Sequence, residues 1–295
     1  MDASKKEFIN LGGFNDLIKM RDGWMVYNKN DSYVGKSIKE YGEWSLGEID
    51  LLKQILTPND VIIEVGSNIG SLTLPLSKIV NQGRIYAFEP QNVVFQNLCA
   101  NISINSITNC FCFQCALTDK INEKLYNLNY NFNAEVNFAA MSFIENKKYY
   151  EDTSKDKRMF YEANINTLDN KFADLNRLKL LKTDAEGMEI NVIKGGVDLI
   201  KRTKPILYVE NDISYKNKSK ELIELLWSLD YKLFWHIMPY YNENNFFKNT
   251  NNIFETFYHC NMLGLPKEIK TNINLMEITD SSFYPLKSKR EKGEK

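Results

Sequence analysis

The pattern of apolar and polar positions divides the chain into an irregular start and a regular remainder. Up to about residue 58, an apolar patch at 8–18 precedes a turn-rich stretch at 28–35, and apolar positions at helical spacing follow Ser45-x-x-Glu48. From Val61, short apolar runs alternate with amphipathic stretches. Such runs are typical of buried strands, and we expect them at 61–65, 84–88, 111–117, 178–183, 205–209, 231–237 and 261–265.

This alternation predicts an α/β fold whose doubly wound, mostly parallel, seven-stranded sheet carries helices on both faces. We expect an N-terminal helical extension over 1–58, the main domain over 59–268 and a C-terminal tail over 269–295. Residues 119–166 break the rhythm and are rich in Tyr and Phe, which predicts an inserted hairpin or flap. Ligands of such sheets bind beyond the carboxyl ends of the strands, so candidate chemistry is sought there.

Composition argues against several classes of protein: those that bind mainly nucleic acid, those that span a membrane and those that are secreted. The 295 residues include 37 Lys and Arg against 38 Asp and Glu, and this balance argues against nucleic acid as the main partner. No apolar run of membrane-spanning length and no secretory signal are visible in the sequence. Five cysteines, an odd number, favour a reduced cytoplasmic protein.

The first strand ends in an acid and a glycine turn. Its pattern is E-x-G-x-x-x-G, from Glu64 to Gly70, and differs from the G-x-G-x-x-G of dinucleotide folds. Gly66 lets the backbone approach a ligand, and Gly70 lets the next helix pack closely. Glu64 would repel a pyrophosphate and suits a cationic ligand. Taken alone, the motif fits a plain strand-to-helix turn equally well.

The next two strands add matching groups at their ends. Glu89 and Pro90 end the second strand, about 20 residues after the glycine turn, where a carboxylate can accept from ribose hydroxyls. Ala116 and Leu117 end the third strand and could flank an adenine. Together the three strand ends have the layout of an S-adenosylmethionine (AdoMet) site.

Several segments across residues 40–265 resemble the FkbM family of class I methyltransferases. They are Gly42-Glu43-Trp44-x-x-x-Glu48, the 64–70 turn, Phe88-Glu89-Pro90, Lys194-Gly195-Gly196 and, most specifically, K-x-D-x-E-G-x-E at 182–189. Glu64 stands where the family commonly has Asp. The resemblance implies an AdoMet-dependent O-methyltransferase with sugar or polyketide-type acceptors. It also implies further cofactor contacts from Glu43, Ser67, Asn68 and Asp184.

Acidic side chains also follow the later strands. Asp184 and Glu186 follow the fourth strand, Glu210 and Asp212 the fifth, and His236 closes the sixth. Strands about 4.8 Å apart can bring these ends into one cleft. One of these groups could take the proton of an attacking hydroxyl, or the acids could hold Mg²⁺. We favour catalysis by a general base without a metal, because no D-x-D-type ligand pair is evident.

Three residues near these motifs have two interpretations each. Lys182 either extends outward from an apolar strand or pairs with a cleft acid. Glu189 is favoured as an acid at a helix N-terminus rather than a catalytic group. Trp44 either packs over the cofactor or joins the core.

The sequence as a whole favours methyl transfer from AdoMet to a hydroxyl of a sugar, glycan precursor or similar small molecule. A nucleic-acid N-methyltransferase is the first rival, but residues 184–187 lack the Asn/Asp-Pro-Pro-Tyr element of that class. A nicotinamide-dependent dehydrogenase is disfavoured by the glycine spacing. Outside enzymes, the alternative is a non-catalytic module with an AdoMet fold.

Overall fold

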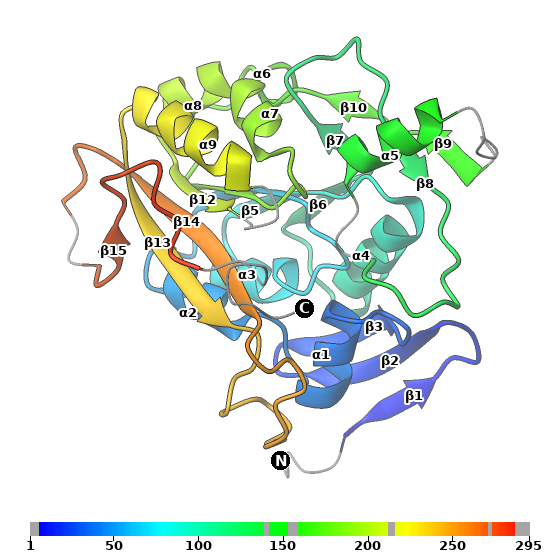
Figure 1. Cartoon of the computed structure of the whole chain (residues 1–295). Helices are drawn as coiled ribbons and strands as arrows, with labels where there is room; N and C mark the ends of the chain where they lie inside the picture. The colour runs from blue at the N-terminus through cyan, green and yellow to red at the C-terminus, as the bar shows by residue number, and fades with distance from the viewer. Residues whose placement is uncertain (1–5, 139–141, 153–158, 212–215, 271–272, 287–295) are drawn as a thin grey trace.

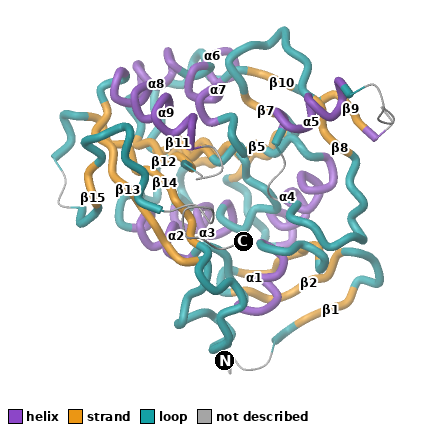
Figure 2. The backbone as a smooth tube through the Cα atoms, viewed as in Figure 1, coloured by secondary structure: helices purple, strands orange, loops and turns teal. Residues whose placement is uncertain are grey.

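A mixed sheet forms the centre of the molecule. The computed structural model describes residues 6–138, 142–152, 159–211, 216–270 and 273–286. Within them, eight strands pair in the order β15-β13-β14-β12-β11-β4-β5-β6 (Figures 1 and 2). Their bounds are β4 Val61–Val65, β5 Arg84–Phe88, β6 Cys110–Phe113, β11 Leu180–Thr183, β12 Ile206–Glu210, β13 Tyr231–Pro239, β14 Tyr258–Pro266 and β15 Met276–Glu277.

Strand direction confirms the predicted α/β class and corrects the strand number. The five neighbouring strands from β6 to β12 run parallel, whereas β14 lies antiparallel between β12 and β13. The strand added to the predicted seven is β15, a two-residue edge strand beside Phe234 and Trp235. Its residues are both exposed, so no apolar run marks it in the sequence.

Helices cover both faces of the sheet. In Figure 1 one face carries α6 (Leu168–Lys171), α7 (Glu189–Lys194), α8 (Val197–Thr203) and α9 (Lys216–Ser228). The other carries α2 (Leu46–Lys53), α3 (Thr73–Ile79) and α4 (Asn92–Ile104). No helix in these described ranges is long and apolar enough to cross a membrane.

Alternation along each strand divides the core into two layers. Ile63 and Val65 pack with the α7–α9 layer, whereas Ile62 packs with the α2–α4 layer. Successive side chains of a strand point to opposite faces, so Glu64 shares the face of Ile62. The same alternation puts Lys182 on that face, beside Glu64 in the register of β11 and β4.

The N-terminal segment is not the helical extension that we expected. Residues 8–28 form a three-stranded antiparallel sheet of β1 (Phe8–Asn10), β2 (Asn15–Met20) and β3 (Gly23–Asn28). Helix α1 (Val34–Tyr41) and α2 follow. Burial in β2 alternates as in a strand, but one of its buried positions is Asp16. That buried acid hides the two-residue period in the sequence.

The inserted segment is built from short pieces. The predicted third strand divides into β6 and β7 (Ala116–Leu117), and β7 leaves the main sheet to pair with β10 (Ile165–Asn166). Between them, β8 (Tyr126–Leu128) pairs with β9 (Phe160–Glu162), and α5 (Phe143–Glu151) lies between these two strands in sequence.

A buried asparagine joins the N-terminal sheet to the main domain. The Asn101 amide in α4 donates to the Val26 and Ile69 carbonyl oxygens at 2.9 and 2.8 Å. Its Oδ1 accepts from the Val26 N–H at 2.6 Å. Asn101 is fully buried, so the three backbone groups have little access to water in its absence.

We therefore expect Asn101→Ala to lower the free energy of unfolding by about 2–4 kcal/mol, because buried polar groups lose their partners. Chemical denaturation measures the change. Gln96→Ala is a matched control in the same helix, since Gln96 is exposed. It should change stability by no more than about 0.5 kcal/mol. Equal effects of the two substitutions would contradict the structural role of Asn101.

Candidate active site

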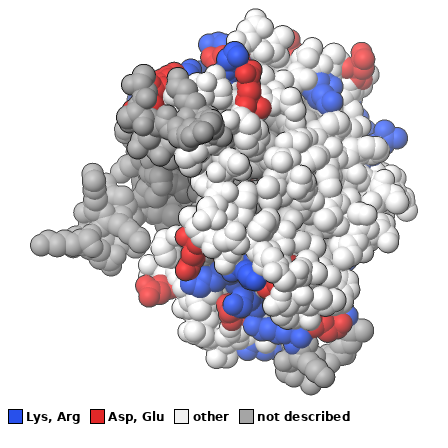
Figure 3. Space-filling model, turned by 90° about the vertical axis from the view of Figure 1, so that its right-hand side faces the viewer, with Lys and Arg blue, Asp and Glu red and all other residues white. Residues whose placement is uncertain are grey.

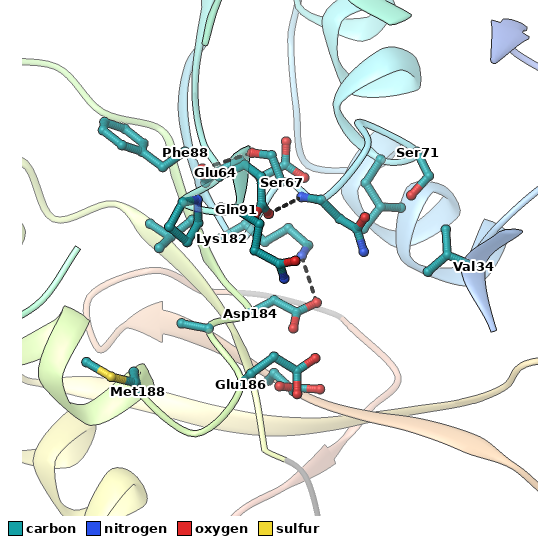
Figure 4. A pocket seen from close by; sticks show the side chains of 18 of the residues that line it. Val34, Glu64, Ser67, Ser71, Phe88, Gln91, Lys182, Asp184, Glu186 and Met188 are labelled. Atoms are coloured by element: carbon teal, nitrogen blue, oxygen red, sulfur yellow. Dashed lines mark hydrogen bonds and ion pairs between the residues drawn. The ribbon is translucent and has the colours of Figure 1, made fainter. Parts of the chain in front are cut away.

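A cavity opens at the carboxyl ends of the parallel strands, as the fold class predicts. It encloses about 1130 Å³, including its open mouth. Figure 4 shows Glu64, Lys182 and Asp184 in its interior and Glu186 nearer Met188. Of the predicted site residues, those that line it are Glu64, Gly66, Ser67, Asn68, Glu89, Pro90, Ala116, Leu117, Asp184, Glu186 and Glu210.

The turn after β4 brings two strand ends into close contact. Gly66 has φ +78°, and a Cβ built there would lie 1.7 Å from the Asp184 carbonyl oxygen. Only glycine fits, because a side chain would meet both a strained φ and a backbone atom. The Gly66 and Ser67 N–H groups donate to the Phe88 carbonyl oxygen at 3.0 and 2.9 Å, which holds the turn against β5.

Glu89 lies under this turn with its carboxylate fixed. Its Oε2 accepts from the Asn68 N–H at 3.0 Å, and its Oε1 accepts from the Gln91 N–H at 2.9 Å. Burial raises the pKa of Glu89 to about 7, although these hydrogen bonds oppose the rise.

Glu64 is the second buried carboxyl group of the cavity. It is 1% exposed and accepts a hydrogen bond from the Thr73 hydroxyl at 2.6 Å. Burial raises its pKa to about 7, and the nearby Lys182 ammonium opposes the rise. A bound cation would favour the ionised form of both glutamates.

Of the two interpretations of Lys182, the structure supports pairing with a cleft acid rather than an outward side chain. Its side chain is 2% exposed, and Nζ lies 3.3 Å from Asp184 Oδ2. Burial disfavours the ammonium, but the carboxylates of Asp184, Glu48 and Glu64 together hold the pKa of Lys182 above its usual range.

Three carboxylates gather in the cavity where β11 and β12 end. Asp184, Glu186 and Glu210 each offer one oxygen, and these oxygens lie within 4.8 Å of one another. Such a set could accept a proton from a substrate or hold a hard cation. Glu186 has φ +51°, a conformation that non-glycine residues seldom adopt outside sites where the surroundings impose it. Asp212, predicted to join this group, lies outside the described residues.

Comparison with known proteins identifies the family. The model of the methyltransferase FkbM domain matches residues 64–233, more than half of the chain. The chain belongs to the FkbM methyltransferase family. Membership confirms the resemblance found in the sequence and implies AdoMet as the cosubstrate.

Individual curated relatives match only parts of the chain. Methyltransferase sdnD of Sordaria araneosa is 28% identical over 161 residues, which are 48% of this chain and 61% of that protein. The tRNA(Phe) (4-demethylwyosine(37)-C(7)) aminocarboxypropyltransferase of Methanocaldococcus jannaschii is 33% identical over 69 residues, covering 22% of this chain and 28% of that protein. The chain thus spans less than two thirds of the length of either relative.

Among solved structures, the methyltransferase FkbM from Methylobacillus flagellatus aligns with a TM-score of 0.43 and 15% identity. The alignment covers 70% of this chain and 44% of that one.

The structure does not place His236 in the cavity of this FkbM domain. Strand β13 continues past it to Pro239, and β14 lies between β13 and β12, so His236 is neither at a strand end nor beside Glu210. His236 Nδ1 instead lies 2.8 Å from the Tyr208 hydroxyl, and the ring borders a different cavity near α2. The interpretation of His236 as a base in the cleft is therefore wrong.

Glu43 is also placed differently from the expectation. It is buried and does not line the cavity. Its Oε2 accepts from Arg21 Nη2 at 2.6 Å and from the Phe246 N–H at 2.9 Å, and its Oε1 accepts from Asn242 at 2.7 Å. Both oxygens are thus engaged in joining Arg21, just after β2, to the 242–246 loop, so the structure places Glu43 outside the cavity.

Gly70 supports the site without lining it. A Cβ there would lie 2.8 Å from Leu98 Cδ1, so this glycine lets α4 pack against the turn.

Glu189 follows the favoured interpretation, because its Oε1 accepts from the N–H groups of Ala185 and Gly187 at 2.9 and 3.1 Å beside the start of α7.

An aromatic wall of the cavity was not predicted as a unit, although packing over the cofactor was one of the two interpretations of Trp44. Tyr33, Trp44, Tyr240 and His259 line it, and the rings of Tyr240 and His259 stack with centroids 4.1 Å apart. Trp44 meets the His259 ring edge-to-face at 4.9 Å. Burial lowers the pKa of His259 to about 3, which keeps the imidazole neutral. No local pattern marks these residues, since they come from three distant segments.

The new placement of Glu43 gives a test. We expect Glu43→Gln to lower the free energy of unfolding by about 1.5–3 kcal/mol, because hydrogen bonds to a charged group are lost. Affinity for S-adenosylhomocysteine (AdoHcy), measured by calorimetry on the folded protein, should stay within about twofold of wild type. A large loss of AdoHcy affinity with unchanged stability would restore the cofactor role.

Proposed function

We propose that the protein transfers a methyl group from AdoMet to a hydroxyl of a sugar, glycan precursor or similar small molecule. The observation that carries the proposal is the glycine turn lying between two buried carboxyl groups, Glu64 and Glu89, at the carboxyl edge of the sheet. We also propose that residues 59–268 form the methyltransferase domain and that residues 1–58 cover its cavity.

The residues at this edge fit AdoMet. Gly66 lets the turn pass close to Asp184 while it lines the cavity, and Glu89 can accept from ribose hydroxyls. Glu64 suits a cationic methionine portion, and Ala116 and Leu117 offer apolar contact to an adenine. When bound, AdoMet supplies an electrophilic methyl group, and the protein supplies alignment and a proton acceptor.

Proton removal is assigned to the acidic group of the cavity. An alcohol needs a base as it attacks, and Asp184, Glu186 and Glu210 converge on one point. We propose Glu186 or Glu210 as the acceptor of the proton, and Asp184, which pairs with the Lys182 ammonium, as the group that orients the hydroxyl.

A metal ion at the same carboxylates is the competing mechanism. Three converging oxygens resemble part of a Mg²⁺ site. The Lys182 ammonium 3.3 Å from Asp184 Oδ2 would repel a second cation at that carboxylate, which favours catalysis without a metal.

A nucleic-acid acceptor has less support. The carboxylates at the cavity would repel a phosphate backbone. On the face shown in Figure 3, Lys and Arg gather at the lower end with acidic side chains among them, and the middle is largely uncharged. The described residues of that face therefore form no continuous basic track of the kind that binds nucleic acid.

The function is tested with methyl-labelled AdoMet and a panel of neutral sugars, phosphorylated sugars and RNA. We expect label to reach a hydroxyl of a neutral acceptor, equally with and without EDTA. Glu89→Ala should weaken AdoMet binding about 10- to 100-fold by removing the acceptor of ribose hydroxyls, whereas the exposed-site control Glu221→Gln should not. Failure to bind either AdoMet or AdoHcy at millimolar concentration would refute the proposal.

The raised pKa values of Glu64 and Glu89, each about 7, predict a pH dependence. Both groups must ionise to attract a cation, so AdoMet affinity should fall as pH drops from 8 to 6, by about tenfold for each group that must ionise. Without ligand, the stability of the protein should change with pH in the opposite direction. The contribution of Glu64 and Glu89 to stability is present at low pH and is lost as the pH rises through 7. Thermal shifts with and without AdoMet check both trends, and a shift independent of pH would contradict them.

A further inference from the structure

A single type of charge dominates the cavity, with one exception. Among the described residues that line it, Lys182 is the one lysine or arginine. The acids that line the cavity with it are Glu64, Glu89, Asp184, Glu186 and Glu210. This ammonium therefore opposes a positive charge on a ligand in the cavity and favours the loss of that charge.

The structure holds Lys182 in its charged form from three sides. Nζ lies 3.3 Å from Asp184 Oδ2, and Glu64 is its register partner on β4. Glu48, on α2, is 2% exposed and accepts from the Ser45 hydroxyl at 2.6 Å, and its charge also favours the ammonium form of Lys182. A lysine buried to this degree keeps its charge only where such carboxylates compensate it.

Methyl transfer changes the charge of the cosubstrate by one unit. The oxygen lone pair of the acceptor forms the new C–O bond, the C–S bonding pair stays on sulfur, and the hydroxyl proton passes to a carboxylate. AdoMet thus carries a sulfonium charge that AdoHcy lacks, while the two share the adenosine and amino-acid portions. Comparing their affinities isolates the interaction of the protein with that one charge.

We propose that Lys182 is a specificity-determining residue that weakens binding of the sulfonium form relative to the neutral thioether form, with Glu48 acting in the opposite sense. The inference rests on the proposed AdoMet-dependent function. A site lined only by acids would bind AdoMet tightly beside the acceptor, but it would also bind AdoMet much more tightly than AdoHcy. The ammonium reduces this preference for AdoMet.

The test is the ratio of the Kd of AdoHcy to the Kd of AdoMet, measured by calorimetry at pH 8, where the carboxyl groups are best able to ionise. Lys182→Met should raise this ratio about tenfold, as expected for removing a like charge at close range in a site of low dielectric. Lys194→Met is the matched control, because Lys194 pairs with Glu221 on the surface, and its ratio should equal that of wild type.

Two further variants keep the test decisive if Lys182→Met folds poorly. Glu48→Gln should lower the ratio, and the double variant Lys182→Met/Glu48→Gln, which removes a buried pair together, should return it toward wild type. A general loss of structure weakens both ligands alike and leaves the ratio unchanged.

The outcomes separate the two proposals. Unchanged ratios in Glu48→Gln and in a lysine variant that still binds AdoHcy would overturn the role of Lys182 and leave the methyltransferase proposal standing. A wild-type protein that binds neither ligand would overturn both.

Discussion

A buried ammonium is the constraint on which the site depends. Charged groups are costly to remove from water, and Lys182 is compensated only because Glu48, Glu64 and Asp184 approach it from separate elements. Glu48 belongs to α2, whereas Lys182 and Glu64 are register partners on β11 and β4. Ser45 and Glu48 have capping-box spacing, yet their side chains bond to each other and Glu48 faces the lysine. The N-terminal segment is thus tied electrostatically to the floor of the cavity.

The sequence was a good guide wherever a local pattern determines the structure. The run of β-branched residues at 61–65, the glycine turn and the acid ending the next strand all fold as their periodicity and turn chemistry predict. The break between α7 and α8 falls at Gly195-Gly196, two consecutive glycines that disfavour a continuous helix. Parallel strands place their ends at one edge, so acids spread from residue 64 to residue 210 could be grouped without knowledge of side-chain contacts.

Long-range pairing explains the errors. His236 was expected beside Glu210, but β14, which comes later in the chain, inserts between their strands. Glu43 has partners such as Asn242 and Phe246, about 200 positions away, and no local rule predicts them. Near the N-terminus, the buried Asp16 interrupted the apolar alternation that identifies a strand. For His236 and Glu43, pairing between distant parts of the chain overrode the local pattern.

One half of the cavity lies within the segment that the family model matches, and the aromatic wall lies outside it. The proposed donor half, from Glu64 to Leu117, lies within the segment that matches the FkbM domain. Tyr33, Trp44, Tyr240 and His259, which form the aromatic wall, lie outside residues 64–233. Family membership therefore accounts for a shared cosubstrate, whereas the aromatic wall is built by parts of the chain that the family model does not match. Acceptor choice is best sought in this aromatic wall and in the 119–166 insertion, whose Asn137 and Phe143 complete the lining.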